Sequence, residues 1–260
     1  MDDYEGFKKK VFTLTSIDLD SYKERQMRRR IDTLIKRHSM SSYEEFVAAI
    51  KADKNLFEEF VNYLTINVSE FYRNPEQWKL LENEILPYLF ERFGNNLKIW
   101  SAACSTGDEP YTLVMLLSKF IPLNKIKVIA TDLDRVVLEK AHIGLYDEKS
   151  LKGLPKEYIT KYFTKVGTKS YQISDDIKKC VEFKQHNLLK DSYPSDCNMI
   201  ICRNVMIYFT EEAKAEIYKK FNASLKSDGI LFVGSTEQII SPGDSGFSTY
   251  KSFFYKKAAR

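Results

Sequence analysis

The stretch LKIWSAACSTGDEPY, residues 97–111, decides the fold of this chain. Its apolar start, LKIW, predicts a buried strand, and the small residues that follow predict a tight turn. Asp108, Glu109 and Pro110 then mark a helix start, because acids favour the first helical turn and proline is tolerated there. A strand, a small-residue turn and a helix start are the geometry with which a doubly wound sheet binds a nucleotide-like ligand at its carboxyl edge.

The charge of this turn indicates which ligand it suits. A phosphate-binding turn favours lysine or an empty helix N-terminus, whereas this turn carries the carboxylates of Asp108 and Glu109. Two carboxylates suit a ligand with a positive group and hydroxyls, and S-adenosylmethionine (SAM) fits that description. The single glycine, Gly107, is a poor match to the dinucleotide fingerprint. From this turn alone, an ordinary strand-to-helix connection with a capping acid is an equal alternative.

The composition excludes several classes of protein. The chain has 260 residues, of which 43% are hydrophobic, enough for one large domain or for a medium domain and a small one. No apolar run of about 18 residues occurs, so no membrane insertion is expected. The start, MDDYEGFKKK, lacks the apolar segment of a secretory signal. A net charge of +4 is too small to argue by itself for a nucleic-acid partner.

The cysteines and histidines argue against a metal site. The four cysteines form no CxxC pair, and the chain has only three histidines. We therefore expect no bound metal, and reduced thiols in a cytoplasmic protein.

The chain up to about residue 65 looks helical and lacks strand-like runs, and an all-helical N-terminal domain is expected over 1–75. Apolar residues recur there at the spacing of one helical stripe, and they are Met27, Ile31, Leu34 and Ile35. The opposite face of that helix carries the basic residues Arg25, Arg29 and Lys36. Such a face is either a solvated helix surface or a docking surface for an acidic partner.

The segment 65–75 mixes turn-forming polar residues with two aromatic residues and an arginine, and it ends at a proline. Its polar members are Asn67, Ser69 and Arg73. They are capping and surface residues, or they belong to a lid between the helical domain and the sheet domain, where pockets commonly lie.

From residue 97 onward, strand and helix patterns alternate, which predicts βαβ units and a parallel sheet. The strand 126–132 ends at Asp132, which follows Gly107 by 25 positions. Such folds place an acid on ribose hydroxyls at a similar spacing. A helix cap is the alternative role for such an acid, and Asp134 is a second candidate for it.

Polar residues also follow the later strands of the predicted sheet. Asn187 closes a third parallel strand, and Arg203 and Asn204 follow the strand 198–202. Because the carboxyl ends of parallel strands share one edge, we expect these residues to form one site with Glu109 and Asp132.

Residues 145–180 interrupt the alternation and predict a small antiparallel β insertion at about 150–180. Its strands are expected at 162–163, 170–173 and 181–183. Beyond it we expect a third parallel strand closing at 185–189, a fifth strand at 230–234 and a last antiparallel edge strand at 253–255.

Six segments, in order between residues 66 and 239, resemble one family closely: INVSEFYRN, IWSAACSTGDEPYTL, IATDLD, HNLL, ICRNVMIYF and GILFVGSTEQI. The chain resembles the chemotaxis receptor glutamate O-methyltransferases, the CheR family. The resemblance implies an all-α N-terminal domain over 1–75. It also implies an α/β, Rossmann-like SAM-dependent methyltransferase domain over 76–260, with the β insertion inside it.

The resemblance also implies an activity and a partner. The family moves a methyl group from SAM to glutamate side chains on the cytoplasmic helical bundle of transmembrane chemoreceptors, leaving S-adenosylhomocysteine (SAH). A monomeric cytoplasmic enzyme recruited to membrane-bound receptors is expected. Such a partner favours the docking interpretation of Arg25, Arg29 and Lys36. The alternatives are a non-catalytic SAM-binding regulatory module that docks on receptors, and a methyltransferase with another acceptor.

The resemblance of these motifs also implies which residues contact the cofactor. They are Asn67, Ser69 and Arg73, Gly107 and Glu109, Asp132, Asn187 and Leu188, and Arg203 and Asn204. Ser69 stands where relatives commonly have Thr, and Asp108 where Glu is common. Some members of the family recognise a receptor tether peptide through the β insertion.

A glutamate acceptor needs no general base, because its side chain is ionised near neutral pH. No Cys-His or Ser-His pairing pattern accompanies the site. Catalysis should then rest on alignment and water exclusion. We expect Arg73 and Tyr208 to orient the methionyl end of the cofactor or the incoming carboxylate, a structural role being the alternative for Arg73.

Overall fold

The computed structural model describes residues 3–258, which form two compact units. One unit comprises the chain up to Asn67 together with Tyr208–Glu216, and the other comprises Val68–Ile207 and the chain from Ile217 onward. The division after Asn67 precedes the domain boundary expected at residue 75. No sequence pattern predicts that Tyr208–Glu216 belongs to the first unit.

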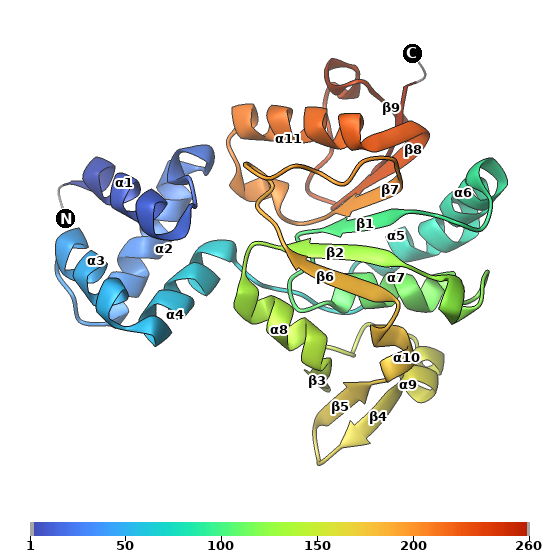
Figure 1. Cartoon of the computed structure of the whole chain (residues 1–260), viewed down its shortest axis with the longest axis horizontal. Helices are drawn as coiled ribbons and strands as arrows, with labels where there is room; N and C mark the ends of the chain where they lie inside the picture. Colours follow the sequence, from blue (N-terminus) through green and yellow to red (C-terminus); the bar gives the residue numbers. More distant parts are fainter. Residues whose placement is uncertain (1–2, 259–260) are drawn as a thin grey trace. The chain divides into compact units, whose positions relative to one another are not determined.

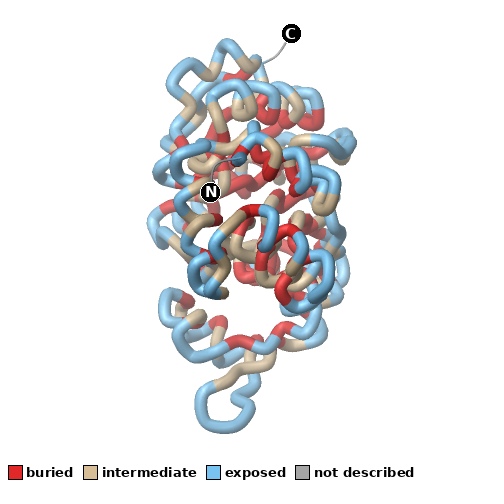
Figure 2. Tube along the Cα trace, turned by 90° about the vertical axis from the view of Figure 1, so that its left-hand side faces the viewer, coloured by how far each residue is buried: buried red, intermediate tan, exposed pale blue. Residues whose placement is uncertain are grey.

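The first unit is built from amphipathic helices, so buried and exposed residues alternate along its trace (Figure 2). The helices are α1 (Tyr4–Thr15), η1 (Leu19–Ser21), α2 (Glu24–Arg37), α3 (Tyr43–Ala52) and α4 (Lys54–Thr65). Three fully buried rings, Phe7, Phe46 and Phe60, form the centre of its core, with the centroids of Phe46 and Phe60 5.2 Å apart. The stripe predicted from Met27 to Ile35 is buried in this core.

The segment Tyr208–Glu216 completes this unit by pairing with the chain before α2. Tyr22 and Phe209 form an isolated antiparallel bridge, and their ring centroids lie 4.8 Å apart. The backbone N–H of Lys23 donates to the Tyr208 carbonyl at 2.9 Å, and that of Thr210 donates to the Ser21 carbonyl at 2.9 Å. The first unit therefore consists of two pieces of chain that lie far apart in sequence.

The second unit contains a seven-stranded mixed sheet in the order β6-β2-β1-β7-β8-β10-β9 (Figure 1). The parallel strands are β1 (Ile99–Ala102), β2 (Val128–Asp132), β6 (Val181–Gln185), β7 (Cys197–Cys202) and β8 (Leu225–Val233). The antiparallel strands are β9 (Phe247–Lys251) and β10 (Phe254–Lys257). The last strand, β10, pairs between β8 and β9, so the expectation that it forms the edge is wrong.

Helices connect the parallel strands, as the alternation predicts. They are α7 (Asp108–Leu117), η3 (Leu123–Lys125), α8 (Arg135–Ile143), η4 (Met206–Tyr208) and α11 (Glu211–Ser224), with η5 (Pro242–Ser245) before β9. Helix α7 is almost wholly buried, so its apolar side chains form part of the main core.

The helical segment that precedes β1 contains a wide turn. It runs as α5 (Pro75–Leu80), a π-helical turn η2 (Leu81–Ile85) and α6 (Leu86–Phe93). Within it, the Leu86 N–H donates to the Leu81 carbonyl, five residues back. Pro87 follows at once, and a proline ring both lacks an N–H and crowds the carbonyl four residues earlier.

The insertion forms a separate three-stranded antiparallel sheet in the order β3-β5-β4. Its elements are β3 (Leu145–Asp147), α9 (Lys156–Tyr162), β4 (Phe163–Val166), β5 (Ser170–Ile173) and α10 (Asp175–Lys178). The assignment of residues 181–183 to this sheet is wrong, because they pair in parallel with β2 as part of β6. The third strand of the insertion is β3, whose three residues are too short a run to stand out in the sequence.

The described part of the chain contains no helix that is both long and apolar enough to cross a membrane. All four cysteines are buried and free of disulfide bonds. The α/β class, the antiparallel insertion and the all-helical N-terminal segment are confirmed.

Candidate functional site

The candidate site lies at the carboxyl edge of the parallel strands in the second unit. Strand β1 is paired with β2 on one side and β7 on the other, so the connections after β1 and β7 diverge at this point of the sheet. The loops after β1, β2, β6 and β7 all leave from this edge. Two backbone bonds join the loops after β1 and β6 to the end of β2. They run from Cys104 N–H to the Thr131 carbonyl and from His186 N–H to the Asp132 carbonyl, both at 2.9 Å.

The turn between β1 and α7 is held in an unusual backbone conformation. Ala103, Ser105 and Gly107 all have positive φ, of 62°, 48° and 89°. A Cβ on Gly107 would come within 3.0 Å of the Ala141 Cβ and the Tyr111 ring, so no other residue fits there without a shift. Tyr146 from β3 donates its hydroxyl to the Thr106 carbonyl at 2.7 Å and secures the turn.

Asp132, at the end of β2, points its carboxylate at this turn. Its two oxygens accept from the backbone N–H of Ser105 at 2.8 Å and of Asp134 at 3.0 Å. Burial raises the pKa of the Asp132 carboxyl to about 6, although these N–H donors oppose the shift. The α8 cap is provided by Asp134, which accepts from Val136 N–H at 2.8 Å, so Asp132 is not needed for capping.

Glu109, in the first turn of α7, forms a buried pair with Arg203. One Glu109 carboxylate oxygen lies 3.5 Å from Arg203 Nη1, and the other accepts from the Ser101 hydroxyl at 2.9 Å. Burial raises the pKa of Glu109 and lowers that of Arg203, while each charge opposes the shift of the other. Arg203 therefore holds a carboxylate at the edge that would otherwise be costly to bury.

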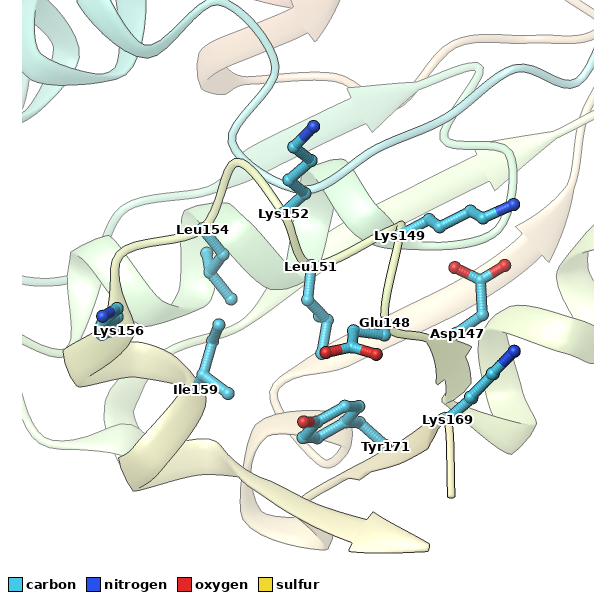
Figure 3. Close-up of a pocket in the computed structure, with 10 residues that line it drawn as sticks. All are labelled: Asp147, Glu148, Lys149, Leu151, Lys152, Leu154, Lys156, Ile159, Lys169 and Tyr171. Carbon is cyan, nitrogen blue, oxygen red and sulfur yellow. The ribbon is translucent and has the colours of Figure 1, made fainter. Parts of the chain in front are cut away.

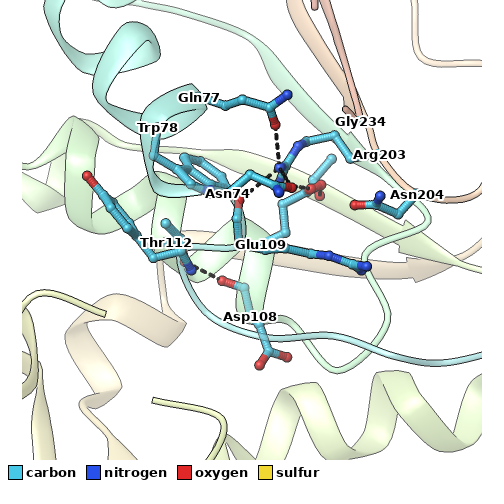
Figure 4. A network of polar contacts seen from close by, with 12 residues as sticks. Asn74, Gln77, Trp78, Asp108, Glu109, Thr112, Arg203, Asn204 and Gly234 are labelled. Atoms are coloured by element: carbon cyan, nitrogen blue, oxygen red, sulfur yellow. Dashed lines mark hydrogen bonds and ion pairs between the residues drawn. The ribbon is translucent and has the colours of Figure 1, made fainter. Parts of the chain in front are cut away.

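The remaining contacts of Arg203 fix the start of α5 and the two residues before it (Figure 4). Its Nη2 donates to the Gln77 side-chain oxygen at 2.7 Å, to the Arg73 carbonyl at 2.9 Å and to the Asn74 side-chain oxygen at 3.1 Å. The guanidinium also lies over the Trp78 and Phe232 rings. Arg203 is thus held mainly by protein groups, and its Nε has no partner among the described residues.

Asp108, beside Glu109, faces a different set of groups. Its carboxylate accepts from the Thr106 hydroxyl at 2.6 Å and is hydrogen-bonded by the Ser69 side chain. Burial raises the pKa of Asp108. The Thr112 hydroxyl, which donates to the Asp108 carbonyl at 2.7 Å, also accepts from the Tyr72 N–H at 3.2 Å. The segment containing Ser69 is therefore attached to the start of α7.

Asn187 and Leu188 follow β6 and are both buried. The Asn187 side-chain oxygen accepts from Leu189 N–H at 2.9 Å, and its N–H donates to Asp191 at 2.8 Å. The Leu188 carbonyl accepts from the Tyr193 hydroxyl at 2.7 Å. These bonds hold both residues at the same edge as Asp132.

Arg73 remains partly exposed. Its Nη1 donates to the Val68 carbonyl at 3.3 Å, and its Nε lies 3.9 Å from Glu70. Asn67 and Tyr208 belong to the first unit. Asn67 donates to the Thr65 hydroxyl at 2.8 Å, and the Tyr208 carbonyl accepts from Lys23.

Two buried polar residues at the edge were not predicted as functional. Gln77 receives the shortest bond from Arg203, and Glu237 accepts three backbone N–H groups near Asn204. The only sequence signals are that Gln77 stands two positions after the helix-start proline Pro75, and that Glu237 stands three positions after Gly234, which follows a strand. Both depend on partners more than 30 positions away.

The arrangement fits a ligand that has a positive group and hydroxyls. It offers the carboxylates of Glu109 and Asp132, and the Ser105 hydroxyl is buried without a partner among the described residues. Such acceptors suit an ammonium or sulfonium and a ribose. No group of three or more His, Cys, Asp and Glu side chains within residues 3–258 is arranged to hold a metal ion.

The insertion contains a cavity of about 730 Å³ (Figure 3). It is lined by apolar and charged side chains, and they are Asp147, Glu148, Lys149, Leu151, Lys152, Leu154, Lys156, Ile159, Lys169 and Tyr171. None of the predicted cofactor residues lines it.

Some basic residues of α2 contact other residues of the first unit, and others are exposed. Arg30 donates to the Tyr63 carbonyl at 2.7 Å, Arg37 pairs with Glu59, and Arg28 lies over the Tyr4 ring. The predicted docking residues Arg25, Arg29 and Lys36 are exposed, and none forms an ion pair with another described residue.

Comparisons with known proteins agree along nearly the whole chain. The family model described as "CheR methyltransferase, SAM binding domain" matches residues 67–253, and "CheR methyltransferase, all-alpha domain" matches residues 2–65. The chemotaxis protein methyltransferase of Listeria monocytogenes is 40% identical over 255 residues, covering 98% of this chain and 97% of the relative. The chemotaxis protein methyltransferase of Borreliella burgdorferi is 33% identical, covering 88% of this chain and 85% of the relative. That of Escherichia coli is 30% identical, covering 87% of this chain and 81% of the relative.

Proposed function

Because the chain belongs to the CheR methyltransferase family, we propose that it transfers a methyl group from SAM to glutamate side chains of chemoreceptors. The family match confirms the SAM-binding domain and the all-α domain predicted from the sequence. The names of the chain's curated relatives, which are methyltransferases, favour an enzyme over a non-catalytic module. The products are a glutamyl methyl ester and SAH.

The observation that best supports a carboxylate acceptor is that the described thiols offer no general base at the edge. The thiols nearest to it, Cys104 and Cys202, are buried, and burial raises their pKa values well above the ordinary range. An acceptor that is already anionic at neutral pH needs no such group. A glutamate side chain meets that requirement.

The cofactor contacts follow from the acceptors at the edge. We assign Asp132 to the ribose hydroxyls, Glu109 to the positive part of the methionyl group, and Asn187 and Leu188 to the adenine. Gly107 keeps the turn beside these contacts in its left-handed conformation, because Ala141 and Tyr111 occupy the space that a Cβ would need. Asn67, Ser69, Asn204 and Arg203 complete the set, Arg203 by holding Glu109 in place. When bound, SAM supplies a methyl group activated by its sulfonium.

The chain's own residues then have to align the acceptor and exclude water. The carboxylate oxygen must approach the methyl carbon in line with the sulfonium, at about 3–3.5 Å. We assign this orienting role to Arg73 and Tyr208. Arg73 suits it because its side chain is one-third exposed and its bonds to Val68 and Glu70 are long. Opposite charges cancel in the reaction, so a drier site favours it.

We propose that the first unit docks on the cytoplasmic helical bundle of the receptor through Arg25, Arg29 and Lys36. These cations are exposed, whereas Arg30 and Arg37 are occupied by internal contacts. A glutamate-rich receptor helix is a complementary partner. The protein is then a cytoplasmic monomer that is recruited to membrane-bound receptors, with a docking domain up to about residue 75 and a catalytic domain after it.

The experiment that tests the reaction measures transfer of labelled methyl from SAM to chemoreceptor-rich membranes. Base-labile label on the receptor is expected, because a glutamyl methyl ester hydrolyses in base. Base-stable label would exclude the carboxyl acceptor. SAM binding without any transfer would favour a regulatory module.

The docking surface is tested by replacing Arg25, Arg29 and Lys36 together with Glu. Receptor methylation should fall at least about tenfold, most strongly at low salt, while the affinity for SAH stays the same. The matched control replaces Lys9, Lys51 and Lys54, which are also exposed residues of the first unit, with the same change in charge. Equal losses in both triple variants would contradict a specific docking face.

A further inference from the structure

We propose that Glu237 is the positioning residue that fixes the turn Arg203–Asn204 for methyl transfer. The inference rests on the proposed cofactor contacts of that turn. Glu237 belongs to the segment GILFVGSTEQI, whose resemblance to the family carried no assigned role for this residue. Its side chain does not need to touch the cofactor.

The carboxylate of Glu237 gathers three backbone donors from two loops. One oxygen accepts from the Asn204 N–H at 2.6 Å and from the Gly234 N–H at 2.9 Å, and the other accepts from the Met206 N–H at 2.6 Å. Glu237 is 5% exposed, so these are charge-assisted bonds away from water. The carboxylate therefore ties the loop after β7 to the loop after β8.

The adjacent strands bring these loops together. Cys202 of β7 is paired in register with Val233 of β8, so Arg203 and Gly234 leave the sheet side by side. The Gly234 loop turns back at once, because the Glu237 N–H donates to the Gly234 carbonyl at 3.1 Å. This turn aims the Glu237 side chain at the N–H groups of the neighbouring loop.

Asn204 needs this support because its backbone is left-handed, with a φ of 61°. Asparagine tolerates that region better than most residues, but the conformation still costs free energy. The bond from Asn204 N–H to Glu237 stabilises it. The same conformation determines where the Asn204 side chain and the preceding Arg203 are directed.

Gly234 provides the space for the arrangement. A Cβ at Gly234 would lie 2.5 Å from a Glu237 carboxylate oxygen, 2.9 Å from Asn204 N and 3.0 Å from the Asn204 side-chain nitrogen. Glu237 and Asn204 therefore occupy the volume that any other side chain would need. Gly234→Ala should displace the turn Arg203–Asn204 by steric crowding, without changing the chemistry of the Glu237 carboxylate.

The test compares Glu237→Gln and Gly234→Ala with the wild-type chain. Glutamine has the same shape but only one acceptor oxygen, so an N–H of the turn would face an NH2 group. Each variant is measured by calorimetric titration with SAH, by thermal unfolding, and by kcat and KM for SAM with receptor-rich membranes. Asp147→Asn is the matched control, because Asp147 also accepts a backbone N–H, that of Ser150 at 2.8 Å.

Both variants should weaken SAH binding about 10- to 100-fold and raise KM for SAM more than they lower kcat. The control should retain its affinity. A lower unfolding temperature with unchanged SAH affinity in both variants would overturn the proposal, since it would leave Glu237 a purely structural role.

Asn204→Ala separates this inference from the proposed site. If Asn204→Ala weakens SAH binding, the double variant with Glu237→Gln should bind no more weakly than Asn204→Ala alone. Additive losses would show that Glu237 does not act through the turn and would overturn the proposal. Normal SAH affinity in Asn204→Ala would instead remove Asn204 from the proposed cofactor site, and with it the positioning role.

Discussion

At the scale of single residues, the site is defined by carboxylates that burial makes costly to ionise. Asp132 and Glu109 both have raised pKa values, although backbone donors or Arg203 stabilise their charges. A ligand that brings hydroxyls or a positive charge stabilises the ionised form of such a buried carboxylate. The cofactor proposed here brings both.

The pH dependence of SAH binding should report Asp132. Its pKa is about 6 when folded and about 3.9 when unfolded, so its contribution to stability is present below about pH 4 and lost as pH rises through about 6. The loss amounts to at most about 3 kcal/mol. SAH affinity should move in the opposite direction and increase from pH 5 to 7.5, because the ionised carboxylate is the better acceptor.

Calorimetric titrations at several pH values check this expectation. Asp132→Asn should flatten the profile between pH 5 and 7.5, whereas Asp175→Asn, at the exposed start of α10, should retain it. A wild-type affinity that does not change across pH 6 would mean that Asp132 does not contact the cofactor.

The positions of these acids could be predicted from the sequence, whereas their supporting contacts could not. Asp132 ends a strand, and strand ends share an edge, so its place follows from local pattern and topology. The hydrogen-bond partners of Arg203 Nη2 lie 126 to 130 positions earlier in the chain. Only the folded arrangement brings Gln77, Asn74 and the Arg73 carbonyl to one guanidinium.

At the scale of elements, the connection between β1 and α7 depends on backbone conformation as much as on side chains. Three residues with positive φ occur within five positions, ending at Gly107. The small residues of the sequence predicted a tight turn, but not that Tyr146 from β3 would hold it. The sequence did not predict strand β3. Its three residues pair with β5, and α9 and β4 separate the two strands along the chain.

Gly107→Ala should be considerably more harmful than Gly167→Ala. Both glycines have positive φ, but a Cβ on Gly167 would meet nothing within 4 Å, whereas one on Gly107 would crowd Ala141 and Tyr111. We expect losses of unfolding free energy of about 2–4 kcal/mol at Gly107 and about 1–2 kcal/mol at Gly167. Urea unfolding measures both, and equal losses would mean that the turn relaxes without strain.

At the scale of the whole molecule, two compact units share one chain that passes between them three times. The helical character of the first unit and the parallel sheet of the second are readable as periodicity. No periodicity reveals that Tyr208–Glu216 belongs to the first unit, because the boundary between the units falls inside the continuous helix α11. Pairing of Phe209 with Tyr22 is a tertiary contact without a local pattern.

Phe209→Ala should therefore destabilise the first unit selectively. Phe209 is 4% exposed, and its truncation should cost about 3–5 kcal/mol. Hydrogen exchange should accelerate in α1 to α4 and less in β1 and β2. Phe247→Ala, which removes an equally buried ring from β9, should give the opposite pattern. Uniform acceleration in both variants would show that the units unfold together.

The two-piece construction of the first unit has an evolutionary consequence. A single recombination event near residue 67 would join one relative's helices to another relative's Tyr208–Glu216, and the Tyr22–Phe209 bridge would then have mismatched partners. On the docking face proposed for α2, receptor preference can therefore diverge by point substitution more readily than by shuffling of whole modules. Chimaeras built to change specificity should exchange both pieces at once.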